Sequence, residues 1–149
     1  MRCRVRWLAA IAALSLTACQ TPPVASIGGA ESREAIALSA AERDHLRSGM
    51  RTYLQSTQEI VDAIATGKVD RAAKSAREAG MGAVKDVSLL SAAKLPPQFT
   101  LLGLDTHQRF DALADAAARA ATRKELLERL GQVLANCSAC HATYRVESH

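Results

Sequence analysis

The chain has 149 residues, a length that suits one folded domain of ordinary size with a short extension. Hydrophobic residues make up 48% of the chain and aromatic residues only 3%, so few large rings are available for a core. The formal charge of +4 includes three arginines before residue 7, in a segment expected to be removed; without them, sixteen basic residues face fifteen acidic ones. This near-neutral balance, with no basic stripe or aromatic ladder, gives no support to a nucleic-acid partner.

Residues 1–18 have the layout of a secretory signal peptide. The segment begins with basic residues, continues with an apolar run over residues 7–16 and ends in small residues, and the run is too short for a stable membrane span. The stretch Leu16-Thr17-Ala18-Cys19 resembles a bacterial lipobox, in which the cysteine is lipid-modified and begins the mature protein. Ordinary cleavage, with Cys19 left as a free thiol, is the alternative.

The composition of residues 19–38 predicts a flexible tether between the lipid anchor and the domain. Two prolines, two glycines and few large apolar residues leave too little surface to bury. We therefore expect a periplasmic protein that is anchored to a membrane through Cys19. Gln20 follows this cysteine in place of the aspartate that usually retains lipoproteins in the inner membrane, which favours the outer membrane.

From residue 39 onward the pattern is helical. A first segment opens with Ser39-Ala40-Ala41-Glu42, a capping box, and runs to about Thr66, where Gly67 ends it. Its expected inward stripe is spaced by three and four residues and consists of Leu46, Met50, Tyr53, Thr57, Ile60 and Ile64. A second segment covers about residues 71–94, and two glycines near its middle predict a kink or break close to Met81.

Pro96 and Pro97 predict a non-helical connection to a third helical segment at residues 105–121. The fourth segment opens with a second capping box, Thr122-Arg123-Lys124-Glu125. Its expected inward stripe consists of Leu127, Leu130, Leu134, Cys137, His141 and Tyr144. Because period-two alternation and β-branched runs are missing, we expect no strands. Residues 39–149 therefore predict an all-α domain, an antiparallel up-down-up-down four-helix bundle.

The fourth segment also contains C-x-x-C-H, the attachment signature of a covalently bound c-type haem, as Cys137-Ser138-Ala139-Cys140-His141. Two thiols at this spacing can each form a thioether with one haem vinyl group, while the adjacent imidazole supplies a neutral nitrogen to the iron. A redox dithiol, half a zinc site or two buried thiols are the alternatives for a bare C-x-x-C. The adjacent histidine and the predicted export favour one haem c, and no second Cys/His pair is present to complete a zinc site.

Cysteine usage supports the lipid anchor. Cys3 leaves with the signal peptide, and Cys137 and Cys140 are assigned to haem, so Cys19 would otherwise be an odd reactive thiol in an oxidising compartment. No disulfide is expected.

The C-terminal C-x-x-C-H motif, followed by Tyr144 and Arg145 and preceded by three amphipathic helices, resembles the cytochrome c′ family of four-helix c-type cytochromes. The resemblance covers about residues 39–147. It implies a haem between the first and fourth helices, with His141 as the proximal iron ligand and often a homodimer. It also implies two branches: one is five-coordinate and binds small gases, and the other has a first-helix methionine as sixth ligand and carries electrons.

In an antiparallel bundle, a ligand opposite His141 should come from the first turns of the first helical segment. Met50 lies there, on the expected inward stripe, and is the predicted sixth ligand; a plain core methionine is the alternative. Arg47 and Arg51 flank it, and either could pair with a haem propionate. Tyr144 and Arg145, which follow the motif, are further candidate haem contacts.

Other residues compete less well for the sixth position. Met81 is expected to pack beside two glycines. His107 is expected to be a capping or surface residue, with bis-His ligation as the alternative. His45 should face away from the haem, and His149 is terminal.

We therefore expect a lipid-anchored monohaem cytochrome that carries single electrons between periplasmic or membrane redox proteins. An independent enzyme is not expected, because the sequence indicates no nucleophile with a base, no paired carboxylates and no substrate pocket. Two alternatives stay open. One is a five-coordinate module that binds NO or CO, with Met50 and Leu46 lining its distal pocket; the other is a haem subunit of a larger oxidoreductase complex.

Overall fold

The structure is a computed structural model that describes residues 31–85 and 94–148. The expected signal peptide, Cys19, most of the expected tether and His149 lie outside the described residues. Ser32–His149 forms one compact unit. In chain order its elements are β1 (Glu34–Leu38), α1 (Ala40–Ala65), α2 (Val69–Glu78), the 3-10 helix η1 (Met81–Val84), α4 (Pro97–Ala118), α5 (Arg123–Thr143) and β2 (Tyr144–Ser148).

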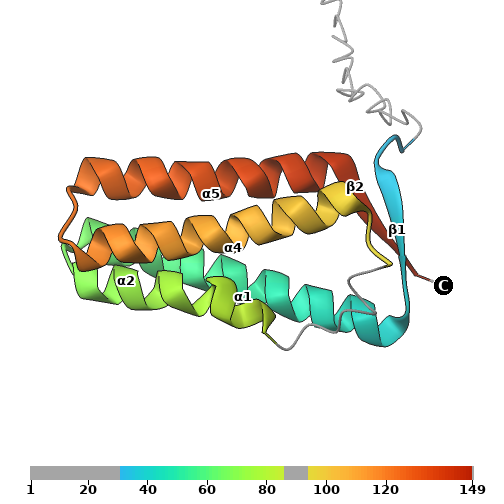
Figure 1. The fold of residues 1–149 in the computed structure, drawn as a ribbon, viewed down its shortest axis with the longest axis horizontal. Helices are drawn as coiled ribbons and strands as arrows, with labels where there is room; N and C mark the ends of the chain where they lie inside the picture. The colour runs from blue at the N-terminus through green and yellow to red at the C-terminus, as the bar shows by residue number, and fades with distance from the viewer. Residues whose placement is uncertain (1–30, 86–93, 149) are drawn as a thin grey trace, which may run out of the picture. The chain divides into compact units, whose positions relative to one another are not determined.

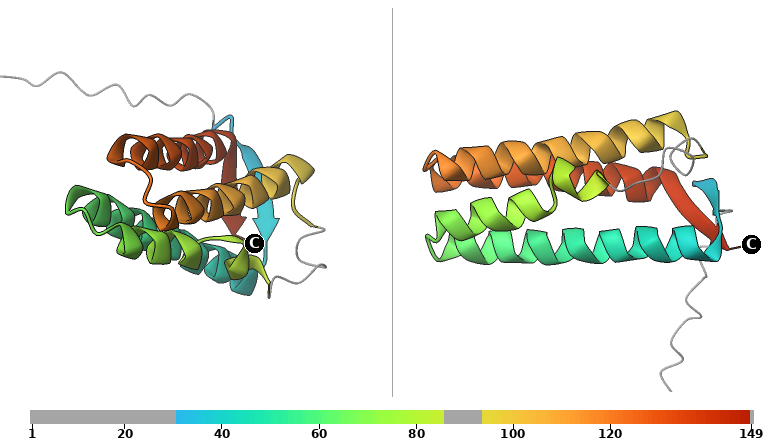
Figure 2. Two further views of the ribbon diagram at one scale, coloured as in Figure 1. Left: turned by 60° about the vertical axis from the view of Figure 1, so that its left-hand side comes forward. Right: turned by 60° about the horizontal axis from the view of Figure 1, so that its bottom comes forward.

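The described residues form a helical bundle. Helix α1 packs against α2, α2 against α4, and α4 against α5. In Figure 1, α4 and α5 lie side by side above α1 and α2, and the two views of Figure 2 keep the same neighbours. The main apolar cluster lies between these helices, and its largest fully buried side chains are Phe110, Ile60, Leu113, Leu126 and Val133. The expectation of a mainly helical, bundle-like domain is confirmed.

Helix α1 begins and ends where its local sequence predicts. The Ser39 hydroxyl accepts a hydrogen bond from the Glu42 amide at 3.3 Å, and the Glu42 carboxylate accepts one from the Ser39 amide at 3.0 Å. Lys94 and the Ser39 hydroxyl each donate to the same carboxylate at 2.8 Å. The hydrogen bonds that this carboxylate accepts, that of Lys94 first, lower the pKa of Glu42 to about 2. The helix stops at Ala65, and Gly67 adopts φ +71°, which favours glycine.

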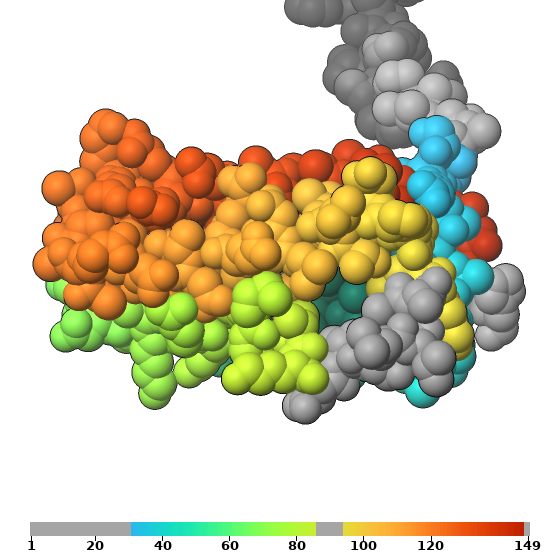
Figure 3. All heavy atoms as spheres, viewed as in Figure 1, coloured from blue at the N-terminus to red at the C-terminus, as the bar shows by residue number. Residues whose placement is uncertain are grey.

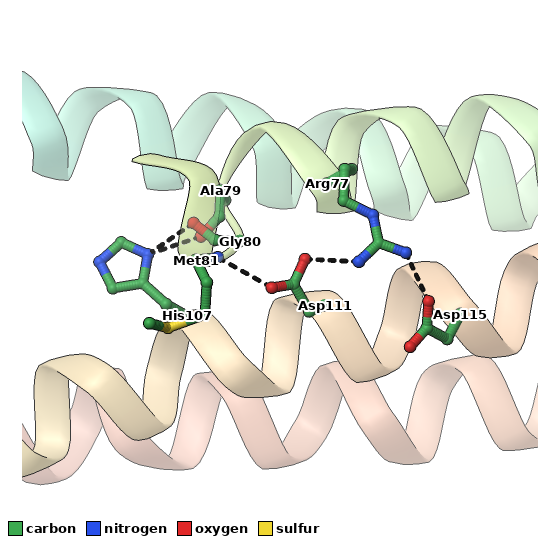
Figure 4. A network of polar contacts seen from close by, with 7 residues as sticks. All are labelled: Arg77, Ala79, Gly80, Met81, His107, Asp111 and Asp115. Atoms are coloured by element: carbon green, nitrogen blue, oxygen red, sulfur yellow. Dashed lines mark hydrogen bonds and ion pairs between the residues drawn. The ribbon is translucent and has the colours of Figure 1, made fainter. Parts of the chain in front are cut away.

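The expected break in the second segment lies at Gly80, between α2 and η1. Asp111 of α4 accepts a hydrogen bond from the Met81 amide at 2.9 Å and one from Arg77 at 2.6 Å, while Arg77 also donates to Asp115 at 2.5 Å (Figure 4). These contacts hold the end of α2 against α4. Gly80 is buried beside the Asp111 carboxylate, so the chain changes direction where no side chain could fit.

The third helical segment starts eight residues earlier than predicted, at Pro97 instead of residue 105. Proline is well suited to the first helical position, where its fixed φ matches the helix and its missing N–H would have no partner. Pro96 is the residue before the helix, in an extended conformation. The helix also ends earlier than expected, at Ala118, and is followed by Ala120 at φ 55°.

Helix α5 starts as predicted, with the Thr122 hydroxyl accepting a hydrogen bond from the Glu125 amide at 3.2 Å. Its buried stripe differs from the prediction. Leu127 and Leu134 remain 48% and 43% exposed, and Leu126 and Val133 are buried in their place. Both stripes satisfy helical spacing, and they differ by a small rotation about the helix axis. The position of α4 decided which of them is buried.

Two short strands correct the expectation of an all-α chain. Residues 34–38, assigned to the tether, form β1, and Tyr144, assigned to the last helical stripe, begins β2. The strands pair in parallel, with Glu34 opposite Tyr144 and Leu38 opposite Ser148. The folded unit therefore begins before residue 39. Local patterns missed this sheet because its two strands come from opposite ends of the unit, and neither is long enough to signal itself.

Replacing Gly80 by Ala should destabilise the fold. A Cβ atom there would lie 2.2 Å from Oδ1 and 2.6 Å from Cγ of Asp111, which is itself held by Arg77 and Met81. We expect the free energy of unfolding, measured with urea, to fall by about 1–3 kcal/mol. Gly82→Ala is the matched control, because nothing lies within 4 Å of its added Cβ; equal losses in the two variants would contradict this explanation.

Candidate haem-binding site

The two thiols of the C-x-x-C-H motif lie on the last turns of α5, at a boundary between two apolar clusters. Cys137 packs against the main cluster of the bundle. Cys140 packs against a small cluster formed by Ile36, Leu38 and Tyr144. Both are free cysteines and half-buried, and burial raises the pKa of each thiol. The two sulfur atoms are therefore held within structured surroundings, mainly as thiols at neutral pH.

A crevice of about 350 Å³ opens beside Cys140 and His141. This volume lies within the range of about 300–1,000 Å³ that is usual for ligand pockets. Its walls come from α1, α4, α5 and both strands. The lining residues are Arg33, Ile36, Leu46, Arg47, Met50, Phe99, Cys140, His141, Tyr144, Arg145 and Val146.

His141 and Met50 line this crevice from two different helices, α5 and α1. Met50 is half-buried, whereas His141 is largely exposed although it contributes to the wall. The expectation that His141 faces the bundle interior is therefore wrong: it faces the crevice at the end of the bundle. The backbone carbonyl of His141 accepts a hydrogen bond from Arg33. The structure thus brings together the imidazole and the thioether that the sequence proposed as axial ligands.

Arginines give the crevice a positive wall. Arg33, Arg47 and Arg145 line it, and its described lining includes no Asp or Glu. Arg145 forms an ion pair with Glu147 through Nη1, while its buried Nε has no hydrogen-bond partner. A buried donor without a partner is costly. The Nε of Arg43, which lies outside the lining, is in the same state. Arg51, the other proposed propionate partner, is exposed and lies outside the lining.

These observations fit a covalently held haem. Cys140 and His141 are at the crevice, Cys137 lies one turn away on the same helix, and the wall contains both apolar and cationic side chains. A macrocycle needs only one or two protein ligands at its iron, because the porphyrin supplies the other nitrogens. Among the described residues no group of three or more His, Cys, Asp or Glu gathers in a way that could hold a bare metal ion.

His107 is neither a cap nor a surface residue, which corrects the sequence analysis. It is only 6% exposed, and its Nδ1 lies 2.8 Å from the carbonyl oxygen of Ala79, as Figure 4 shows. Its Nε2 forms a short hydrogen bond with the Tyr53 hydroxyl. The pattern assigns the Nδ1–H tautomer, with Nε2 accepting from Tyr53. Both ring nitrogens are therefore occupied, and His107 does not line the crevice.

Tyr53 is a residue that sequence reasoning placed only on a helix stripe. Its ring stacks on Phe110 with centroids 5.8 Å apart and meets His107 edge-on. Burial, with Cys137 and Cys140 nearby, raises the pKa of Tyr53 to about 12. Tyr53 of α1 therefore connects the rings of α4 to the contacts that His107 makes at the end of α2. Only the tertiary structure shows this connection, because its partners come from three separate helices.

The remaining candidates lie away from the crevice. Met81 belongs to η1, where its amide bonds Asp111, and His45 is exposed on α1; neither lines the crevice. The lining residues that the sequence analysis did not single out come mainly from the strands and from the start of α4: Arg33, Ile36, Val146 and Phe99. In the sequence, only the alternation of Ile36 and Leu38 indicates a strand here, and this pattern is too short to predict one.

Comparisons with models of protein families, with characterised proteins and with solved structures give no match to this chain. Within the described residues, no helix is both long and apolar enough to cross a membrane.

Proposed function

We propose that this chain is a monohaem c-type cytochrome of the c′ type, which carries single electrons while tethered to a membrane on its periplasmic side. The observation that supports it best is the shared crevice, in which the Cys140-His141 end of the attachment motif meets Met50 of α1. A C-x-x-C-H motif alone fixes only one side of a haem. A methionine on the same crevice supplies a candidate ligand for the other side.

The proposed roles follow from the chemistry of each side chain. Cys137 and Cys140 form the thioethers, His141 is the proximal ligand and Met50 the distal one. Arg47 and Arg145 pair with the propionates, while Tyr144 packs beside the macrocycle. When bound, the haem supplies an iron that exchanges one electron between its ferric and ferrous states. Methionine ligation and the apolar walls favour the ferrous state, which suits a carrier between redox proteins.

The proposed architecture is an antiparallel up-down-up-down bundle around this single haem. It is supported by the short connections from α1 to α2 and from α4 to α5, which allow neighbouring helices to pack side by side. A homodimer is part of the proposal only through the family resemblance. We propose a carrier rather than an enzyme, with redox proteins as its partners.

A gas-binding module is the second candidate. Leu46 and Met50 line the crevice together, one helical turn apart on α1, and both are half-buried. The same two side chains could therefore enclose a small distal space without any bond from sulfur to iron. In that case the iron is five-coordinate and binds NO or CO.

The proposed membrane anchor is a lipid on Cys19. It is supported by the lipobox-like stretch that ends at Cys19 and by the signal-like segment before it. A tether of about twelve residues between Cys19 and the folded unit would let the domain reach partners near the membrane surface.

Covalent attachment is tested by Cys137→Ala and Cys140→Ala. Each variant loses one thioether and leaves one haem vinyl group unreacted, so the yield of haem-loaded protein should fall sharply. When both cysteines are replaced, no covalent link is left, and haem should become extractable by acidic organic solvent. Ser138→Ala is the control, because this exposed residue lies between the two cysteines and should leave haem fully covalent. Haem that resists extraction when both cysteines are replaced together would refute the assignment.

The absorption spectrum of the ferric protein separates the two candidate functions. A low-spin spectrum with the weak far-red band of methionine ligation supports the carrier, and a high-spin spectrum with rapid CO binding on reduction supports the gas binder. In the carrier, Met50→Ala removes a ligand, so the iron should become high-spin or bind water and the midpoint potential should fall. A low-spin spectrum that survives Met50→Ala would rule out Met50 as the ligand.

Two controls accompany Met50→Ala. Met81→Ala should leave the spectrum unchanged, since Met81 lies away from the crevice. His107→Ala should also keep the spin state, while the loss of the Tyr53 and Ala79 partners lowers the free energy of unfolding by about 1–3 kcal/mol.

The lipid anchor is tested by Cys19→Ala in cells that process lipoproteins. The variant should remain unprocessed or become soluble, whereas Cys3→Ala should behave like the wild type because Cys3 lies inside the signal peptide. Mass spectrometry of the mature wild-type protein should show a lipid-modified Cys19. An unmodified N-terminus at another residue would disprove the anchor.

A further inference from the structure

Strand β1 forms part of the crevice wall although it precedes the helical bundle in sequence. It pairs in parallel with β2, which directly follows the attachment motif, and places Ile36 opposite Val146. Both of these residues line the crevice. In Figure 3, β1 lies at one end of the bundle between the first turns of α4 and the C-terminal strand.

Burial of its side chains stabilises β1 more than its backbone hydrogen bonds with β2 do. A lone two-stranded sheet is at best marginally stable in water. Here Ile36 and Leu38 are only 2% and 6% exposed, and both belong to the small apolar cluster with Tyr144. Leu46 of α1, Phe99 of α4 and Cys140 of α5 pack against this cluster. The strand is therefore anchored to three helices.

The two buried residues of β1 have different positions. Ile36 lines the crevice, whereas Leu38 belongs to the same cluster but does not line it. One residue of the strand thus covers the space beside Cys140, and the other anchors the strand. This difference makes Leu38 a natural control for Ile36.

Arg33, just before the strand, adds a polar contact at the same place. Its Nη1 donates to the backbone carbonyl of His141 at 3.4 Å. That carbonyl lies in the last turn of α5, where carbonyls lack intrahelical partners and a positive charge is favourable. Because this hydrogen bond is long, Arg33 stabilises the turn that contains His141 mainly by placing a positive charge beside it.

We propose that β1 is a wall of the haem crevice, in which Ile36 seals the edge at Cys140 and Arg33 steadies the His141 turn. This inference rests on the proposed function. Ile36 is a positioning residue: it shields the site from water and so favours the ferrous state, because water stabilises the more highly charged ferric iron. Strand β1 covers residues 34–38, which the sequence assigned to the tether, so part of that expected tether belongs to the wall of the crevice.

The test compares Ile36→Ala with Leu38→Ala in the full-length haem-loaded protein. Ile36→Ala should lower the midpoint potential, because it opens the Cys140 edge to water. Leu38→Ala should leave the potential near the wild-type value, and Ile36→Val, which keeps most of the side chain, should restore it. Equal shifts in both alanine variants, or no shift in Ile36→Ala, would overturn the assignment.

A second measurement does not depend on haem. In full-length protein produced without haem attachment, Ile36→Ala should speed the alkylation of Cys140 by iodoacetamide but not that of Cys137, which packs against the other cluster. Equal acceleration at both cysteines, or none, counts against the wall. If the wild-type protein never acquires haem, the proposed function fails, and this alkylation ratio alone decides the role of β1.

Discussion

Cys137 contacts the main apolar cluster of the bundle, and Cys140, one turn later, contacts the small cluster of Ile36, Leu38 and Tyr144. This passage of α5 from one cluster to the other determines where the crevice lies. Cys137 is held by residues of the helices. Cys140 is held by residues of β1 and β2, which come from opposite ends of the folded unit. The attachment motif therefore lies on a helix, while part of the crevice wall beside it comes from segments that are distant in the sequence.

The core that supports this arrangement is made largely of small residues. Five alanines of α2 and α4 are at most 1% exposed: Ala72, Ala76, Ala114, Ala116 and Ala117. The buried part of the main cluster includes one aromatic ring, that of Phe110. The polar contacts that remain inside are matched: His107 bonds Tyr53 and the carbonyl of Ala79, and Asp111 bonds Arg77 and Met81. Because the Met81 amide donates to Asp111, and the carbonyls of Ala79 and Gly80 accept from His107, the polar groups at the end of the short second helix have partners.

The crevice has a different character from this interior. Its wall mixes apolar side chains with three arginines, and the buried Nε of Arg145 has no partner among the described atoms. A haem site would have this composition, with apolar side chains around the macrocycle and cationic side chains around the propionates. The proposed haem would match this mixed lining of apolar and cationic side chains.

The sequence by itself determined the features that depend on neighbours a few residues apart. These are the start of α1 at Ser39, the end of α1 before Gly67, the start of α5 after Thr122 and the break near Gly80, all of which follow from local hydrogen bonds or backbone freedom. The prediction that Met50 lies on the inward stripe of α1 is of the same kind, since it uses helical periodicity; its role as an iron ligand stays a prediction.

The tertiary structure alone decided the rest. The strands pair across more than one hundred residues, the buried face of α5 depends on the position of α4, and His107 is buried by partners from α1 and the end of α2. No local pattern encodes these contacts, because their energy comes from side chains that meet only after the helices have packed.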